Sequence, residues 1–298
     1  MGSAIKFQIA ITIAIAVFTS ACAEVTSENV VYENTEMNVE VTDESSVSDV
    51  TAPEKSTEPI AEEEKTGIEA LWYYEPERAD RYAAFSAARP DLTEEEVVWM
   101  VGCDLDLTPY EDVSSVPDPK DILLLVNKYY FLPEDYVPDD LISVGNTQMR
   151  KEAGEALLEM IDAAASENNK LWSQSGYRNY SLQARLYNDY VERSGQEAAE
   201  KSSARPGHSE HQTGLTTDLN TITEAFGETA EGKWVADNCH EYGFIIRYTM
   251  DNLDVTHFKY EPWHIRYVGK EAAMTIHEKG IASFEEYWVK YVKHKPLY

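Results

Sequence analysis

Residues 204–220 read ARPGHSEHQTGLTTDLN, and this stretch decides how we expect the second half of the chain to fold. If His211 and Asp218 bind one metal ion, they cannot share a helix. Seven residues rise about 10 Å along a helix axis, whereas bonds to zinc are about 2 Å long. Gly214 lies between them and permits a sharp turn. We therefore expect His211 on the turn and Asp218 on the strand that returns from it.

A third ligand must come from the seven histidines of the chain, and among them His264 has a carboxylate three residues before it. Pro262 biases Glu261 toward an extended backbone, which indicates a strand. Residues three apart on a strand face opposite sides, so the chain must bend at Pro262 and Trp263 to bring Glu261 and His264 together. A carboxylate beside a zinc-bound water can take its proton and hand it to a leaving amine, a role that Glu261 fits. Taken singly, each of these side chains is more often plain polar surface.

The composition is that of a soluble protein with an unusually acidic balance. The chain has 298 residues, 54 acidic against 25 basic, for a net charge of −29. A chain of this length can bury a sizeable core without cross-links. So negative a surface repels nucleic acid and anionic lipid, and we exclude both as main partners. No protein partner is predicted.

The first 22 residues, MGSAIKFQIAITIAIAVFTSAC, are typical of an export signal. Lys6 precedes an apolar run of about fifteen residues, shorter than the roughly 20 that a membrane-spanning helix needs. The last five letters resemble a bacterial lipobox, in which Cys22 becomes the lipidated N-terminus, although Thr19 replaces the usual leucine. The prediction is a lipoprotein-type signal, with plain secretion or an uncleaved anchor as alternatives.

Residues 23–66 are rich in Glu, Asp, Ser and Thr and lack an apolar period. Such a segment cannot bury enough apolar surface to offset the entropy of ordering, so it predicts a disordered acidic tether. We expect an exported protein in the cell envelope, held by its N-terminal lipid on the outer face of the cytoplasmic membrane.

Residues 67–298 alternate periodic apolar segments with turn signals and predict one folded domain. Helices come first and strands cluster later, which favours an α+β fold with a small antiparallel sheet flanked by helices. Asn146 or Thr147 is expected to cap the third helix, and Ser181 and Gly195 to bound the fourth. The predicted helices occupy residues 76–88, 92–102, 146–169, 181–195, 232–243, 270–280 and 283–292. The predicted strands occupy residues 121–126, 170–178, 214–220, 244–249 and 257–269.

Two cysteines, Cys103 and Cys239, lie within this domain. In an oxidising compartment such a pair can form a disulfide. Two buried free thiols are an equal alternative, because the sequence gives no distance between them.

Four blocks of the domain resemble the signature of VanY-type D-alanyl-D-alanine carboxypeptidases, in the LAS group of zinc peptidases with its hedgehog-like fold. They are SGYRNYSLQ (175–183), RPGHSEHQTGLTTDLN (205–220), EYGFIIRY (241–248) and YEPWHIRYVG (260–269). The similarity runs over roughly residues 95–280, and the blocks stand in the family's order.

The resemblance implies one zinc ion per chain. The family's S-x-H-x-x-G-x-x-x-D block supplies two zinc ligands, which fall on His211 and Asp218. Its E-x-W-H block supplies the catalytic base and the third ligand, which fall on Glu261 and His264.

The resemblance also implies substrate contacts. Arg178 and Gln183 match positions that hold the terminal carboxylate of the substrate and its reacting carbonyl, and Ser209 matches a pocket residue. The chemistry agrees for Arg178, because a guanidinium presents a fixed fork of donors suited to a carboxylate. Trp263 either forms a pocket wall or packs.

Some residues stand apart from the implied site. His257 lies where a small turn residue is expected, and Cys239 where alanine is common in the family. His208 and Glu210 are predicted to be solvated residues on the rim of the site.

The implied function is a zinc-dependent D,D-carboxypeptidase that removes the C-terminal D-alanine from peptidoglycan stem peptides. An L,D-carboxypeptidase acting on tetrapeptide stems shares the same motifs and stays open. A catalytically silent wall-binding lipoprotein is an alternative of another class, which the presence of all four zinc-site residues disfavours. An amidase or endopeptidase cutting inside cross-links is a third.

Overall fold

The computed structural model describes residues 66–294, which belong to one unit. The predicted export signal, Cys22 and the predicted tether up to residue 65 lie outside the described residues. Within residues 66–294, no helix is both long and apolar enough to cross a membrane.

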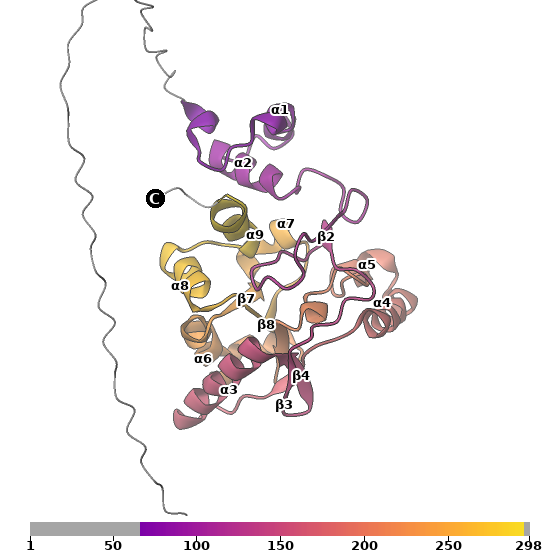
Figure 1. Cartoon of the computed structure of the whole chain (residues 1–298), viewed down its shortest axis with the longest axis vertical. Helices are drawn as coiled ribbons and strands as arrows, with labels where there is room; N and C mark the ends of the chain where they lie inside the picture. Colours follow the sequence, from indigo (N-terminus) through magenta and orange to yellow (C-terminus); the bar gives the residue numbers. More distant parts are fainter. Residues whose placement is uncertain (1–65, 295–298) are drawn as a thin grey trace, which may run out of the picture. The chain divides into compact units, whose positions relative to one another are not determined.

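A four-stranded antiparallel sheet forms the centre of the domain (Figure 1). Its strand order is β5 (Ser173–Ser175), β6 (Thr216–Leu219), β8 (Glu261–Tyr267) and β7 (Phe244–Tyr248). Helices flank this sheet, so the predicted α+β class is confirmed. The register of β6 against β8 pairs Asp218 directly with His264. Two of the predicted ligands therefore lie opposite each other on neighbouring strands.

Most predicted helices appear close to their expected places. In the view of Figure 1, α6 and α8 lie to the left of β7 and β8, and α4 and α5 to their right. The α-helices of the described residues are α1 (Ala79–Ala88), α2 (Glu94–Gly102), α3 (Lys151–Ser166), α4 (Tyr180–Ser194), α5 (Gln196–Glu200), α6 (Ala230–Asn238), α7 (Leu253–Thr256), α8 (Lys270–Lys279) and α9 (Phe284–Tyr287). A π-helix (Trp288–Lys293) continues α9.

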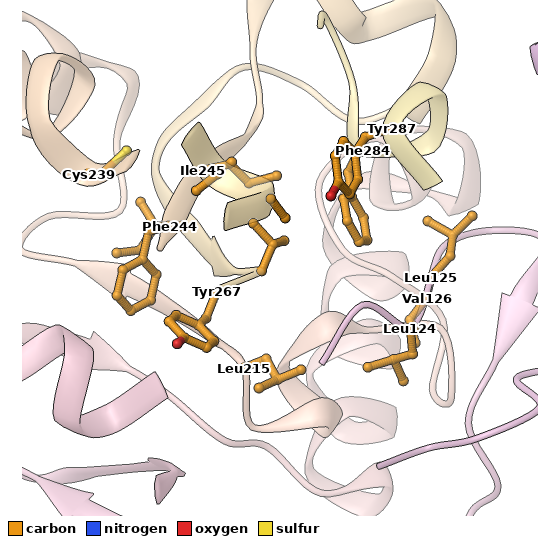
Figure 2. Packing of buried hydrophobic residues seen from close by; sticks show 14 of the residues in the cluster. Leu124, Leu125, Val126, Leu215, Cys239, Phe244, Ile245, Tyr267, Phe284 and Tyr287 are labelled. Carbon is orange, nitrogen blue, oxygen red and sulfur yellow. The ribbon is translucent and has the colours of Figure 1, made fainter. Parts of the chain in front are cut away.

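One continuous apolar cluster holds these elements together. Helix α3 contributes Leu157 and Met160, both fully buried, on the face that its apolar periodicity predicts. Figure 2 shows part of the cluster, with Phe244 beside Tyr267 at a ring-centroid separation of 5.2 Å. Burial of such side chains stabilises each by about 1.5–3 kcal/mol relative to exposure.

The N-terminal helices are fastened to the C-terminal segment of the domain. Trp72 donates from its indole nitrogen to the carbonyl of Lys290 at 3.0 Å, and the Lys290 ammonium lies 2.6 Å from Glu95 at the start of α2. Lys293 donates to the carbonyl of Gly102 at 2.8 Å, which satisfies the C-terminal end of the same helix. Segments near the two ends of the described chain therefore contact each other directly.

The predicted cap of α3 is wrong. Residues 147–150 form strand β4 (Thr147–Arg150), which pairs with β3 (Leu141–Val144) in a hairpin. Gly145 has φ +60 in the two-residue turn, and Thr147 bonds the carbonyl of Val144 with its hydroxyl. The Gly-Asn pair is a hairpin signal, and it outweighs the capping pattern here. The helix begins only at Lys151.

The predicted strand over residues 121–126 is also wrong, because this apolar run is irregular. Its side chains Leu124, Leu125 and Val126 are buried as expected. Two of its backbone carbonyls accept hydrogen bonds from a side chain rather than from a neighbouring strand. Arg266 donates to the carbonyls of Ile122 and Leu124 at 2.9 Å each. The nearby strand pair is short and parallel, β1 (Ser114–Ser115) with β2 (Tyr130–Phe131).

The N-cap of α4 is Asn179, which accepts from the backbone of Leu182, so the prediction of Ser181 is wrong by two residues. Gly195 ends the helix as predicted. Cys103 and Cys239 are both buried free thiols, which settles the alternative left open by the sequence.

Gly214 is expected to be more sensitive to substitution than Gly145, although both have positive φ. A Cβ at Gly214 would lie 3.0 Å from the side chain of Arg150 and 3.1 Å from Leu141. A Cβ at Gly145 would have no neighbouring atom within 4 Å. Gly145→Ala should lower the free energy of unfolding by about 1 kcal/mol and Gly214→Ala by about 2 kcal/mol or more. Urea unfolding of the metal-free protein measures both, and equal losses would contradict the crowding at Gly214.

Candidate metal centre and active site

Three side chains from separate elements converge on one point. His211 lies on the 3-10 helix Glu210–Thr213, Asp218 on β6 and His264 on β8. The Nε2 atom of His211 lies 3.4 Å from one oxygen of Asp218, and the Nδ1 atom of His264 lies 3.2 Å from the other. The three ligand atoms lie within 4.8 Å of one another, and all three residues are buried. The structure brings together the residues that the sequence selects.

The turn between His211 and Asp218 has the form that their spacing predicts. Gly214 ends the 3-10 helix in the left-handed conformation, with φ +71 and ψ 9, and β6 begins two residues later. His211 therefore stands on the turn and Asp218 on the returning strand, as expected.

Hydrogen bonds leave one ring nitrogen of each histidine facing the cluster. The Nδ1 atom of His211 lies 2.7 Å from the carbonyl of Gly176, which can only accept, so Nδ1 carries the hydrogen. Its Nε2 atom is buried without a hydrogen-bond partner. The Nε2 atom of His264 lies 3.3 Å from Glu210, leaving Nδ1 for the cluster. This pattern is typical of histidines that bind a metal.

The separations fit zinc. Bonds of about 2.0–2.1 Å in a tetrahedral arrangement place ligand atoms about 3.3 Å apart. Each histidine nitrogen lies close to this distance from an oxygen of the Asp218 carboxylate, His211 Nε2 at 3.4 Å from one oxygen and His264 Nδ1 at 3.2 Å from the other. Two nitrogens and a carboxylate would leave a fourth position for water or substrate.

The electrostatics of the cluster also favour a cation. Burial lowers the pKa of His211 to about 4, so this ring is neutral. Burial would raise the pKa of Asp218, but both histidines outweigh it and hold that pKa well below its usual range. Burial opposes the charge on His264 as well, yet its hydrogen bonds to Asp218 and Glu210 raise its pKa to about 9. The metal-free chain thus keeps a proton where a metal ion would bind.

Glu261 reaches the cluster through an irregularity in β8. The register between β7 and β8 shifts between the pairs Tyr248–Glu261 and Ile246–Ile265, which is the bend that Pro262 and Trp263 predict. A carboxylate oxygen of Glu261 lies 3.7 Å from Nδ1 of His264.

The environment of Glu261 suits proton transfer. Burial, with the nearby charge of Asp218, raises the pKa of Glu261 to about 7 even though His264 and Arg178 oppose the shift. A carboxylate with a pKa near neutrality can take up and release a proton during a reaction.

Arg178 points its guanidinium toward the same cavity. One terminal nitrogen lies 4.0 Å from Asp218, and the Nε atom is buried without a hydrogen-bond partner. Burial lowers the pKa of Arg178, but a guanidinium stays charged in proteins. A buried donor fork with open capacity beside the cluster fits a carboxylate from outside the chain.

The cavity itself has a volume of about 560 Å³, and its lining includes the three cluster residues, Glu261 and Arg178. Ser209 and Trp263 also line it, as the resemblance implies. The lining residues that the sequence analysis did not select include Ser175, Leu186, Tyr190, Ile222, Glu224, Tyr248, Phe258 and Lys259. Ser175 and Tyr248 lie on strands β5 and β7, within two of the family-like blocks, whereas Leu186 and Tyr190 lie on helix α4.

Gln183 lines the cavity, and its hydrogen bonds define which way its side-chain amide faces. Its Nε2 atom donates to the carbonyl of Ala204 at 2.8 Å and approaches the hydroxyl of Ser203 at 3.3 Å. Its Oε1 atom is buried without a partner. Gln183 therefore offers an acceptor, which fits a substrate N–H rather than the carbonyl or carboxylate oxygen that the resemblance implies.

Glu210 is not on the rim, and this prediction is wrong. Its side chain is fully buried because Arg247 and Arg266 each donate to it at 2.9 Å. His208 is partly buried outside the cavity lining, with Nδ1 2.8 Å from the carbonyl of Asn127. No local pattern indicates this burial, because the arginine partners lie 37 and 56 residues from Glu210.

A buried lysine holds the loop before Glu261. Lys128 donates to the carbonyls of His257 and Glu200 at 2.9 Å each and lies 4.5 Å from the ring centroid of Phe258. His257 has φ +56, a conformation that explains why a small turn residue is expected there. The hydroxyl of Tyr129 lies 3.3 Å from the His257 ring. These contacts fix the wall of the cavity that Phe258 contributes.

Comparison with known proteins agrees with this geometry. The family described as VanY, D-alanyl-D-alanine carboxypeptidase, matches residues 146–270. The putative carboxypeptidase YodJ of Bacillus subtilis (strain 168) is 42% identical over 204 residues, covering 63% of this chain and 74% of YodJ. A D-alanyl-D-alanine carboxypeptidase of Enterococcus faecium is 32% identical over 188 residues, covering 58% of this chain and 59% of the relative.

Solved structures show the same likeness. The LdcB LD-carboxypeptidase aligns with a TM-score of 0.57 at 42% identity, covering 62% of this chain and 93% of LdcB. A variant of the vancomycin-resistance D,D-pentapeptidase VanY, in complex with Zn(II), aligns with a TM-score of 0.50 at 32% identity. That match covers 57% of this chain and 99% of the other.

The α+β fold and the His-Asp-His cluster with its adjacent carboxylate define a carboxypeptidase domain of the metallopeptidase type. The chain belongs to the VanY family of D-alanyl-D-alanine carboxypeptidases.

Zinc binding is expected to release a proton from His264. At about pH 6 the metal-free chain carries that proton, because the pKa is raised to about 9, whereas His211 is already neutral. The experiment uses the Glu261→Gln variant, whose amide side chain has no proton to release, so that the proton released on zinc binding can be assigned to His264. Calorimetry in two buffers of different ionisation enthalpy should then show about one proton released per zinc.

The same competition sets how zinc affinity depends on pH. Since zinc displaces a proton, apparent affinity should rise about tenfold per pH unit and level off as the pH approaches the pKa of His264. An affinity that does not change with pH would contradict a protonated His264 in the metal-free site.

Proposed function

We propose that this protein is a zinc-dependent D,D-carboxypeptidase that removes the C-terminal D-alanine from peptidoglycan stem peptides. The observation that carries the proposal is the position of Arg178, whose open donors lie beside the His-Asp-His cluster and Glu261 in one cavity. A carboxylate bound by Arg178 would belong to the last residue of a peptide. The bond that joins this residue to the chain then lies next to the metal centre.

Each side chain has a role in this reaction. His211, Asp218 and His264 would hold the zinc ion, which when bound supplies a Lewis acid and lowers the pKa of a water at the fourth position. Glu261 takes a proton from the attacking water and delivers it to the nitrogen of the departing residue. The water oxygen adds to the carbonyl carbon as the C–N bond breaks, so the products are a shortened peptide and a free amino acid.

An L,D-carboxypeptidase is the second candidate. The likeness to LdcB, at 42% identity and a TM-score of 0.57, supports it directly. Both activities need a terminal carboxylate site and the same metal centre. They differ in the configuration of the residue on the acyl side of the cleaved bond.

The substrate is tested with three synthetic peptides and the full chain. These are a stem pentapeptide ending in D-Ala-D-Ala, the corresponding tetrapeptide, and the pentapeptide with a C-terminal amide. The products are identified by mass. We expect the pentapeptide to be shortened to a tetrapeptide and the amidated peptide to be spared, because Arg178 needs a carboxylate.

Other outcomes would redirect the proposal. Cleavage of the tetrapeptide alone would establish the L,D activity instead. Cleavage of the amidated pentapeptide would contradict the role of Arg178 and favour an endopeptidase or amidase. A chain that binds zinc and cleaves none of the peptides would support the silent wall-binding alternative.

Glu261→Gln should separate metal binding from catalysis. An amide keeps the size of the side chain but cannot take up a proton, so hydrolysis should fall about 100- to 10,000-fold. Zinc content, measured by atomic absorption, should stay near one ion per chain. Full activity would refute the base role, and loss of zinc would show that Glu261 is a ligand.

We also propose that the protein is exported through residues 1–22 and acts in the cell envelope, where peptidoglycan is found. The export-type signal and the lipobox-like sequence ending at Cys22 support this location. Fractionation of cells that make the native chain tests it, and recovery in the cytoplasmic fraction would contradict it.

A further inference from the structure

Glu210 lies at the meeting point of a buried charge network and the metal centre. Its side chain has no exposed surface. One oxygen, Oε1, accepts from Nε of Arg247 and from a terminal nitrogen of Arg266, both at 2.9 Å. The other oxygen, Oε2, lies 3.3 Å from Nε2 of His264 and accepts from the hydroxyl of Thr216 at 3.3 Å. The two oxygens thus face different partners.

The arginine side of this network fixes how the carboxylate is turned. Arg247 and Arg266 are themselves buried, and each has further acceptors that hold its guanidinium in place. Arg247 forms a two-point pair with Glu285, at 3.0 and 2.6 Å. Arg266 donates to two backbone carbonyls of the irregular segment 121–126. The two arginines therefore fix the orientation of the Glu210 carboxylate through Oε1, and Oε2 faces His264.

A carboxylate held in this way can only accept a hydrogen bond. The Nε2 atom of His264 must then carry the hydrogen. In a neutral ring this leaves the lone pair on Nδ1, the atom that faces Asp218. The hydrogen bond selects the ring form that can bind a metal ion through Nδ1.

We propose that Glu210 is a positioning residue that holds His264 in the orientation and tautomer required for metal binding. This inference rests on the zinc centre of the proposed function. Glu210 is a neighbour of the ligand His211 in sequence, but its action is on His264, 54 residues away. The network that supports it reaches Glu285, which lies outside the family-matched residues 146–270.

Glu285 provides a matched control for Glu210. Both are buried glutamates with no exposed side-chain surface, and both pair with Arg247. The contacts of Glu285 are to Arg247 and Asn127, away from the metal centre. A change at either residue disturbs the same buried network, but only the change at Glu210 removes the contact to His264.

The Glu210→Gln variant should invert the hydrogen bond. The two arginines still require an acceptor, so the amide oxygen of glutamine faces them and its NH₂ group faces His264. Nε2 must then accept, which moves the ring hydrogen to Nδ1, where it competes with the metal. We expect zinc affinity to fall about 10- to 100-fold relative to wild type. Glu285→Gln should leave zinc affinity within about twofold, since the hydrogen bond to His264 is retained.

The experiment is a zinc titration of the full chain against a competing chelator, for wild type and both variants. Circular dichroism and thermal unfolding of the metal-free proteins report how much each change costs the fold. Proton NMR of the metal-free proteins, in which Nδ1 of His264 is not occupied by zinc, provides a second readout. The Nε2 hydrogen of His264 should give a downfield, exchange-protected resonance in wild type and Glu285→Gln and should be lost in Glu210→Gln.

Equal zinc affinities for Glu210→Gln and Glu285→Gln would overturn the proposal, as would an unchanged Nε2 resonance in Glu210→Gln. If Glu210→Gln does not fold, Glu210→Asp and Glu285→Asp make the same comparison, because both shorten a buried carboxylate by one methylene. A wild-type chain that binds no zinc would refute the metal centre itself. Tight wild-type binding with no difference between the variants would refute only the role of Glu210.

Discussion

The pairing of Asp218 with His264 across β6 and β8 is the constraint on which the site depends. The register places the two residues directly opposite each other, so the β-ladder fixes their separation before any metal binds. His211 joins them because the 3-10 helix and Gly214 turn the chain back onto β6. Glu261 joins them because β8 is irregular at its start. Each part of the centre thus depends on ordinary features of the sheet.

The second constraint is charge in the interior. Glu210, Arg247, Arg266 and Glu285 are all buried, and the cost of removing such groups from water is large unless they are paired and hydrogen-bonded. Here the pairing is nearly complete, and it extends to the backbone carbonyls of the segment 121–126. A hydrophobic replacement could be as stable. The network is better explained by what it orients than by what it contributes to stability.

The domain also shows how the two ends of the described chain support the sheet. Helix α2 contacts the segment that begins at α9 through the pair of Glu95 and Lys290, and that segment supplies Glu285 to the buried network. The family-matched residues 146–270 contain the cluster, Glu261 and Arg178, but not this support. The elements around the family core therefore bear on the centre through packing and charge, without lining the cavity.

The errors of the sequence-based prediction share one cause. Residues 121–126 have the composition of a strand, but Arg266 satisfies their carbonyls from a position more than 140 residues away. Residues 146–150 have a helix-capping pattern, but they form a Gly-Asn turn and a strand that pairs with β3. Glu210 looks like a rim residue until Arg247 and Arg266 are placed around it. Local patterns cannot report a partner that is distant in sequence.

The sequence by itself determined the α+β class, the selection of His211, Asp218, His264 and Glu261, and the turn at Gly214. These follow from spacing, residue chemistry and a family resemblance. Only the tertiary structure decided that Glu210 lies beneath the metal centre, that Gln183 presents an acceptor, and that Cys103 and Cys239 are free thiols. The physical reason is that hydrogen-bond direction and burial depend on which distant groups share an interior, and that is fixed only when the chain has folded.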